Sequence, residues 1–228
     1  MKKEALDKER LSFHNLNATR VIATTVGVIS GFSGFNHGFF EFLQGNIPTN
    51  GLVIQAIGEA QRFWDRGTEE AFTIIPNFLI SGILSMALGL TIIIWSLRFI
   101  QTTYGRTVYL VLFILLFLVG GGIGQLVFFI PAWAFATRMN KPLTWWRKVL
   151  PQGIWPFLSN LWIITLILSS MAILIGLEIA IFGFFPGMTD PETIQNTALI
   201  FVLISAFLNI ISFIAGFGHE LRIMNQSN

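Results

Sequence analysis

Residues 107–137 read TVYLVLFILLFLVGGGIGQLVFFIPAWAFAT, an uncharged stretch bracketed by Arg106 and Arg138. An unbroken helix of this length would extend about 46 Å, whereas the hydrocarbon core of a bilayer is about 30 Å thick. Four glycines near its middle form a predicted hinge: Gly120, Gly121, Gly122 and Gly124. The stretch therefore either crosses a membrane once with a long overhang, or breaks at the hinge and returns to the side from which it entered.

The composition places the whole chain in the class of helical membrane proteins. Hydrophobic residues make up 54% of the 228 residues, charged residues only 11%, and 23 residues are phenylalanine. A soluble core could not hide so much apolar surface. The chain has no cysteine, which excludes disulfides and thiol catalysis. Its net charge of +2 arises from basic residues near segment ends, so no nucleic-acid partner is predicted.

Five apolar segments predict an all-α transmembrane bundle, with the third segment broken into a hairpin and six membrane passes in total. The segments lie at residues 21–43, 74–97, 107–137, 155–185 and 195–217. They form one transmembrane domain, 21–217, between an N-terminal cytoplasmic lead, 1–20, and a C-terminal tail, 218–228. Residues 52–64 carry apolar side chains at helical spacing, which predicts either an interfacial helix or an ordinary packed loop helix.

The distribution of Lys and Arg favours the broken hairpin. If the central stretch crosses once, the two sides of the membrane receive seven basic residues each. If it returns, the side that holds both termini receives twelve and the other side two. Positively charged loops stay in the cytoplasm. We therefore predict a multi-pass protein of the plasma membrane with both termini in the cytoplasm.

Small residues on the first segment predict a close helix contact. Their spacings of four, three and four residues put them on one stripe: Gly27, Gly31, Gly34 and Gly38. Small residues let a second helix approach closely within a membrane. His37 and Glu41 lie beside this stripe and are expected to face protein.

Polar residues within the apolar segments are the candidates for a binding site, because burying them in a membrane is costly. The broken hairpin brings His37 and Glu178 to a similar depth of about 10 Å from the outer surface. The candidate substrate-binding residues are His37, Glu41, Asn77, Gln125 and Glu178. The alternative is that His37 and Glu41 satisfy each other and Glu178 caps a neighbouring helix. His219 and Glu220 are expected at an exposed cytoplasmic boundary.

Three functions fit this pattern. The first is a small transporter or channel-like protein with a titratable polar site in the outer third of the membrane. The second is an intramembrane enzyme that acts on a lipid or isoprenoid-type substrate, with His37 as general acid or base. The third is an accessory or sensor subunit that binds another membrane protein through its glycine stripe.

The sequence indicates the bilayer as a partner, together with a small solute, ion or lipid, and with a second copy or another membrane protein as a further possibility. No familiar catalytic motif is present. No two histidines share a helix face, so no metal site is predicted, and nothing in the sequence identifies a cofactor.

Overall fold

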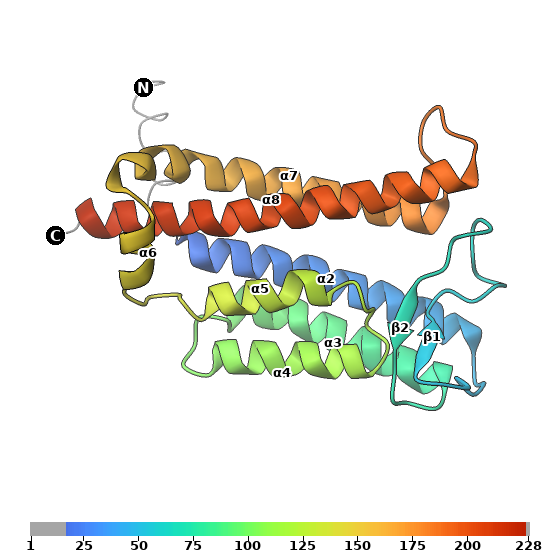
Figure 1. The fold of residues 1–228 in the computed structure, drawn as a ribbon. Helices are drawn as coiled ribbons and strands as arrows, with labels where there is room; N and C mark the ends of the chain where they lie inside the picture. The colour runs from blue at the N-terminus through green and yellow to red at the C-terminus, as the bar shows by residue number, and fades with distance from the viewer. Residues whose placement is uncertain (1–16, 227–228) are drawn as a thin grey trace, which may run out of the picture.

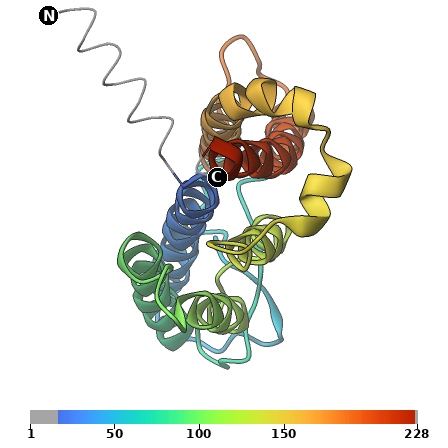
Figure 2. The same cartoon turned by 90° about the vertical axis from the view of Figure 1, so that its left-hand side faces the viewer.

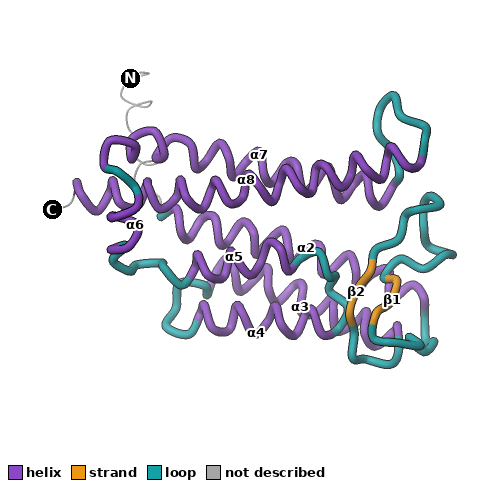
Figure 3. The backbone as a smooth tube through the Cα atoms, viewed as in Figure 1, coloured by secondary structure: helices purple, strands orange, loops and turns teal. Residues whose placement is uncertain are grey.

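The computed structural model describes residues 17–226, and its elements are almost all helical (Figure 1). The predicted lead at residues 1–20 lies outside the described residues except for its last four. The helices are α2 (Ala18–Gln44), α3 (Phe78–Arg98), α4 (Gly105–Leu118), α5 (Leu126–Ala136), α6 (Thr144–Val149), η1 (Gln152–Ile154), α7 (Trp155–Phe182) and α8 (Pro191–Gln226). Two short strands, β1 (Val53–Gln55) and β2 (Glu70–Phe72), form an antiparallel hairpin at one end of the bundle (Figure 3).

Helix α2 lies at the centre of the bundle. Seen end-on, it separates the α7–α8 pair from the α3–α4 pair, with α5 alongside (Figure 2). The helix begins after Asn17, whose side chain accepts a hydrogen bond from the amide of Arg20. It ends at Gly45, where a φ of 82° turns the chain away. Helices α3, α5, α7 and α8 all pack against this helix.

The glycine stripe of α2 lies against α3 and α4. A Cβ added at Gly38 would lie 2.6 Å from the carbonyl oxygen of Gly82, and one at Gly31 would lie 2.7 Å from that of Gly89. Gly27 and Gly34 lie against Tyr109 and Leu116 of α4 in the same way. The small residues on both α2 and α3 thus bring the two backbones into direct contact.

Helices α7 and α8 form a second antiparallel pair, which serine hydroxyls join. The hydroxyl of Ser169 donates to the carbonyl of Ser205 at 2.9 Å, and the hydroxyl of Ser205 donates to the carbonyl of Ser169 at 2.8 Å. Ser212 donates to the carbonyl of Trp162. This reciprocal bonding holds the two longest helices together at mid-length.

The central stretch is broken into two helices at the predicted glycines. Helix α4 ends at Leu118, α5 begins at Leu126, and the chain reverses direction between them (Figure 1). Gly120 and Gly122 have φ values of 105° and 94°, which residues with a Cβ rarely adopt. We call residues 119–125 the glycine turn.

Strand β2 supplies hydrogen-bond partners to the backbone of the glycine turn. The amide of Gly120 donates to the carbonyl oxygen of Phe72, and the amide of Ile123 donates to the carbonyl oxygen of Glu70. Just after the strand, the amide of Ile74 donates to the carbonyl oxygen of Leu118 at the end of α4. Non-helical backbone at membrane depth is tolerated only where protein surrounds it and satisfies its polar groups. The segment between α2 and α3 therefore closes the end of the broken hairpin.

Two sequence-based expectations are wrong in this part of the fold. Residues 52–64 contain β1 and turns instead of an interfacial helix. Residues 218–226 continue α8 instead of forming a tail, and Gly218–Leu221 are buried. The first error arose because a few apolar residues at helical spacing were outweighed by strand pairing with residues 70–72.

Three helical spans are long and apolar enough to cross a membrane: Phe78–Arg98, Gln152–Phe182 and Pro191–Gln226. Helices α4 and α5 are apolar but shorter, with 14 and 11 residues. Helix α2 has 27 residues, yet its glycine, serine and polar residues keep it outside this group. Large apolar side chains such as Ile94, Ile167 and Phe207 are exposed on the outer faces, as expected of a protein embedded in a membrane.

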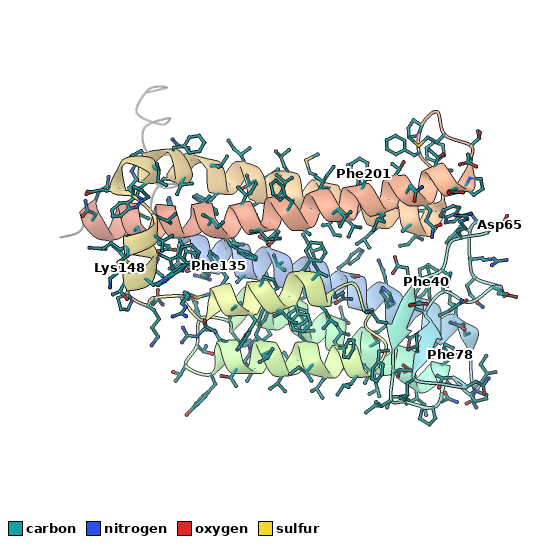
Figure 4. All side chains as sticks on the ribbon, in the orientation of Figure 1. Phe40, Asp65, Phe78, Phe135, Lys148 and Phe201 are labelled. Atoms are coloured by element: carbon teal, nitrogen blue, oxygen red, sulfur yellow. The ribbon has the colours of Figure 1, made fainter. Side chains whose placement is uncertain are left out.

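Charged residues gather at the two ends of the bundle. Lys148 on α6 and Asp65 in the segment before β2 mark opposite ends in Figure 4. Of the ten Lys and Arg residues between 17 and 226, only Arg62 and Arg66 lie at the end that carries the strands. Both ends of the described chain lie at the other, basic end (Figure 1).

Candidate functional site

A cavity of about 410 Å³ lies beside α2 and is lined by residues of α2, the segment at Glu69 and Glu70, the glycine turn, α5, α7 and α8. Its apolar lining includes Val26, Ile173 and Val202. Polar side chains are numerous on its wall: Ser30, Ser33, His37, Glu69, Glu70, Gln125, Ser169, Ser170, Ser205 and Asn209. The cavity therefore offers both apolar surface and hydrogen-bonding groups to a small molecule.

An ion pair between α2 and the segment before β2 forms one part of the wall. Nε2 of His37 lies 2.6 Å from Oε2 of Glu69. The His37 side chain is 8% exposed and that of Glu69 is 23% exposed. Burial opposes ionisation of Glu69, but the charge and hydrogen bond of His37 outweigh it and hold the pKa of Glu69 below its usual range. The pair thus presents a carboxylate stabilised by an imidazole.

The glycine turn brings Gln125 to the cavity. Its side-chain amide donates to Oγ of Ser33 at 3.3 Å and to the carbonyl of Gly121. A Cβ added at Gly122 would lie 2.7 Å from Nε2 of His37, so the turn packs directly on the imidazole. The break in the central stretch therefore places both a backbone turn and an amide side chain next to the ion pair.

The opposite wall is formed by the serine-bonded part of α7 and α8. The side-chain amide of Asn209 donates to Oγ of Ser169 at 3.4 Å. Its Oδ1 atom is buried and accepts no hydrogen bond from any described residue. Buried polar atoms are normally satisfied, so this oxygen is a candidate to receive a donor from a molecule in the cavity.

Glu41 lies next to the glycine turn but does not line the cavity. It is fully buried, and a Cβ at Gly120 would collide with its carboxyl group. Neither carboxyl oxygen has a hydrogen-bond partner of good geometry among the described residues. Glu41 therefore belongs to a second polar group, separate from the cavity wall.

Three of the five predicted site residues are not brought to the cavity: Glu41, described above, Asn77 and Glu178. Glu178 is on an exposed face of α7, while its neighbour Leu177 lines the cavity. Asn77 caps the start of α3 by accepting from the amide of Ile80, and its amide donates to Asn46 at 2.7 Å. His37 pairs instead with Glu69, a residue outside the predicted set.

The expectation for His219 and Glu220 is also corrected, because both are buried. Nδ1 of His219 lies 2.8 Å from Oγ of Ser159, and the carboxylate of Glu220 accepts from the amide of Thr19 at 3.1 Å. These contacts join α8 to α7 and to the start of α2. Their role in the described structure is to hold the basic end of the bundle together.

No group of three or more His, Asp or Glu side chains suited to a metal ion occurs within residues 17–226. The chain matches no protein-family model, no curated protein and no solved structure.

Proposed function

We propose that this protein is a small membrane transporter that binds a solute in the cavity between α2, the glycine turn, α5, α7 and α8. The observation that carries the proposal is a cavity of about 410 Å³ lined by a His–Glu pair and placed beside a broken helical segment. Broken helices at membrane depth recur in transporters, where the break and its neighbouring side chains bind solute.

The lining suggests the chemistry of the solute. The carboxylate of Glu69 and the side-chain oxygen of Asn209 can accept hydrogen bonds from a solute, while serine hydroxyls and Gln125 can donate them. Apolar side chains of α2, α7 and α8 complete the wall. A small molecule with a polar or cationic group and an apolar body fits this combination.

The membrane topology is part of the proposal. We infer that α4 and α5 enter from the basic end and return to it, and that this end, with both termini, faces the cytoplasm. As helices of 14 and 11 residues they extend only about 21 and 16 Å, less than the bilayer core. The strands lie at the end of the bundle beside the glycine turn (Figure 1). We further propose that this membrane is the plasma membrane.

Thiol labelling tests the proposal, because the natural chain has no cysteine to interfere. Ser170→Cys places a thiol on the cavity wall, and Ser85→Cys is the control in a fully buried contact between α2 and α3. A small cationic methanethiosulfonate that cannot cross membranes is added to intact cells and, separately, to inverted vesicles.

A transporter predicts that the Ser170→Cys variant reacts from each side of the membrane and that the Ser85→Cys variant reacts from neither. Reaction only with a lipid-soluble maleimide would contradict the proposal and favour a site that opens to the lipid, as in an enzyme with a lipid substrate. Reaction with no reagent would contradict it in favour of a packed accessory subunit.

A further inference from the structure

The carboxyl group of Glu41 lies in a buried group of oxygen atoms beside Gly120 of the glycine turn, and it is not among the residues that line the cavity. Glu41, Ser81 and Thr73 are each at most 1% exposed. The hydroxyl of Ser81 lies beside the Glu41 carboxyl. The same Oγ atom lies 2.7 Å from the carbonyl oxygen of Val119 and 2.9 Å from Oγ1 of Thr73. These atoms come from α2, α3, the segment after β2 and the glycine turn.

The directions of these hydrogen bonds can be assigned by counting protons. The carbonyl of Val119 can only accept, so the single proton of Ser81 is directed to it. Thr73 must then donate its proton to Ser81. Ser81 keeps one free lone pair and has no proton left for Glu41. This arrangement can receive a donor from Glu41 but offers no donor to it.

An ionised Glu41 would therefore be unsupported. No Lys or Arg within residues 17–226 pairs with it, and the imidazole of His37, one helical turn away, is already bound through Nε2 to the carboxylate of Glu69. The facing atoms of α3, of Thr73 and of the turn are hydroxyl, carbonyl and glycine atoms. Burying an unpaired carboxylate is energetically costly.

We propose that Glu41 is a proton-binding site: its carboxylic acid donates a hydrogen bond to Ser81, and loss of this proton releases the glycine turn. When Glu41 ionises, the hydroxyl of Ser81 must rotate to serve the carboxylate, and the carbonyl of Val119 loses its donor. Val119 is the first residue of the turn that carries Gln125 to the cavity. The proton on Glu41 is thereby linked to the shape of the cavity wall.

The direct contacts of Ser81 with Thr73 and with Val119 favour a proton over a metal cation at this place. Ser81 and Val119 already contact each other directly. A sodium ion would need several oxygen ligands spread around it. The proton site itself does not depend on the proposed function, whereas its linkage to solute binding does.

Infrared difference spectroscopy of the full-length protein tests the site without any knowledge of the solute. We expect the wild type at pH 7 to show a C=O stretching band of a buried carboxylic acid. Glu41→Gln should remove this band, while Glu178→Gln, a change at an exposed glutamate, should leave it. The melting temperature of the Glu41→Gln variant should stay within about 3 °C, because an amide N–H can donate to Ser81 as the acid does.

A second variant keeps the test informative if the Glu41→Gln protein does not fold. Ser81→Ala removes the acceptor and should shift the carboxylic acid band to higher frequency. Identical spectra for the wild type and Glu41→Gln, or an unshifted band in Ser81→Ala, would overturn the proton site. A rise in melting temperature with sodium chloride but not choline chloride, lost in Glu41→Gln, would overturn it in favour of a sodium site. None of these outcomes depends on the labelling of Ser170→Cys, so the two proposals can fail separately.

Discussion

His37 is the residue at which the separate parts of the site meet. Its imidazole pairs with Glu69 from the segment between the strands, packs on Gly122 of the turn, and lies one helical turn from Glu41. The sequence predicts His37 as a site residue because a histidine in an apolar segment is costly. It does not predict Glu69, because a glutamate in a polar connecting segment carries no such signal.

A double-mutant cycle measures the His37–Glu69 pair. His37→Ala and Glu69→Gln should each lower the free energy of unfolding by about 1–3 kcal/mol, because each leaves the other partner partly buried without its bond. The double mutant should lose less than the sum of the two, with an interaction term of at least about 0.5 kcal/mol. Denaturation in detergent provides the measurement, and strict additivity would show that the pair contributes nothing.

The same pair predicts a direction for pH dependence. Since the pKa of Glu69 is lowered in the folded protein, its contribution to stability is fully present above the usual glutamate pKa of about 4.3. It is lost as the pH falls through the lowered pKa. Melting temperatures measured between pH 3 and 7 should therefore fall more steeply at the acid end for the wild type than for Glu69→Gln. Parallel curves for the two proteins would contradict the shift.

Substitutions in the glycine turn can distinguish Gly120 and Gly122, which the fold requires to be glycine, from Gly124, which it does not. Gly120→Ala and Gly122→Ala place a Cβ at positive φ, against the Glu41 carboxyl and the His37 ring. Each should destabilise the protein by at least about 2 kcal/mol. Gly124→Ala is the control, because a Cβ there has no atom within 4 Å. Equal melting temperatures for all three variants would show that the turn is built differently.

At the scale of elements, the segment between α2 and α3 is where the sequence is least informative. Apolar residues at 52–64 fit a helical period, but the same residues include Val53 and Ile54, which alternate as in a strand. The choice depends on hydrogen bonds to Glu70–Phe72 and, through them, on a glycine turn some fifty residues further along the chain. A local sequence pattern carries no information about a hydrogen-bonding partner so distant in the chain.

The break in the central stretch and the α2 glycine stripe could be predicted, because each depends on residues within one segment. Three consecutive glycines interrupt a helix wherever they occur. Glycines at four- and three-residue spacing share a face whatever lies opposite. The partner glycines on α3, Gly82 and Gly89, were not predicted, since two glycines seven residues apart are a weak signal.

The close contact of α2 and α3 can be tested by matched substitutions in two helices. Gly89→Ala would place a Cβ 2.5 Å from the carbonyl oxygen of Gly31, a backbone atom that cannot move aside. Gly176→Ala would place one no closer than 3.2 Å, against a side-chain atom of Val202. Alanine favours a helix over glycine by up to about 1 kcal/mol in both cases.

Gly89→Ala should therefore lower the melting temperature, and Gly176→Ala should leave it unchanged or raise it. Thermal unfolding of the two variants, read side by side in the same detergent, gives the comparison. If Gly89→Ala behaves like Gly176→Ala, α2 and α3 are further apart than described here.

For the whole molecule, the decisive property is that the chain returns at the glycine turn. The return puts residues 138–154 at the same end as the described termini, and residues 183–190 at the end of the strands (Figure 1). It also fixes the direction of α7, and so brings Ser170 and Leu177 to the wall that His37 lines. Charge counting could predict this return, but only packing explains why Glu178 points away from the cavity.

The sidedness of Lys148 and Met188 tests this return most directly. Lys148→Cys and Met188→Cys are each made in the natural chain, which has no cysteine, and intact cells are treated with a thiol reagent that cannot cross the membrane. We expect the Met188→Cys variant to react at once and the Lys148→Cys variant to react only after the membrane is permeabilised. The reverse result, or reaction of both variants in intact cells, would contradict the broken hairpin.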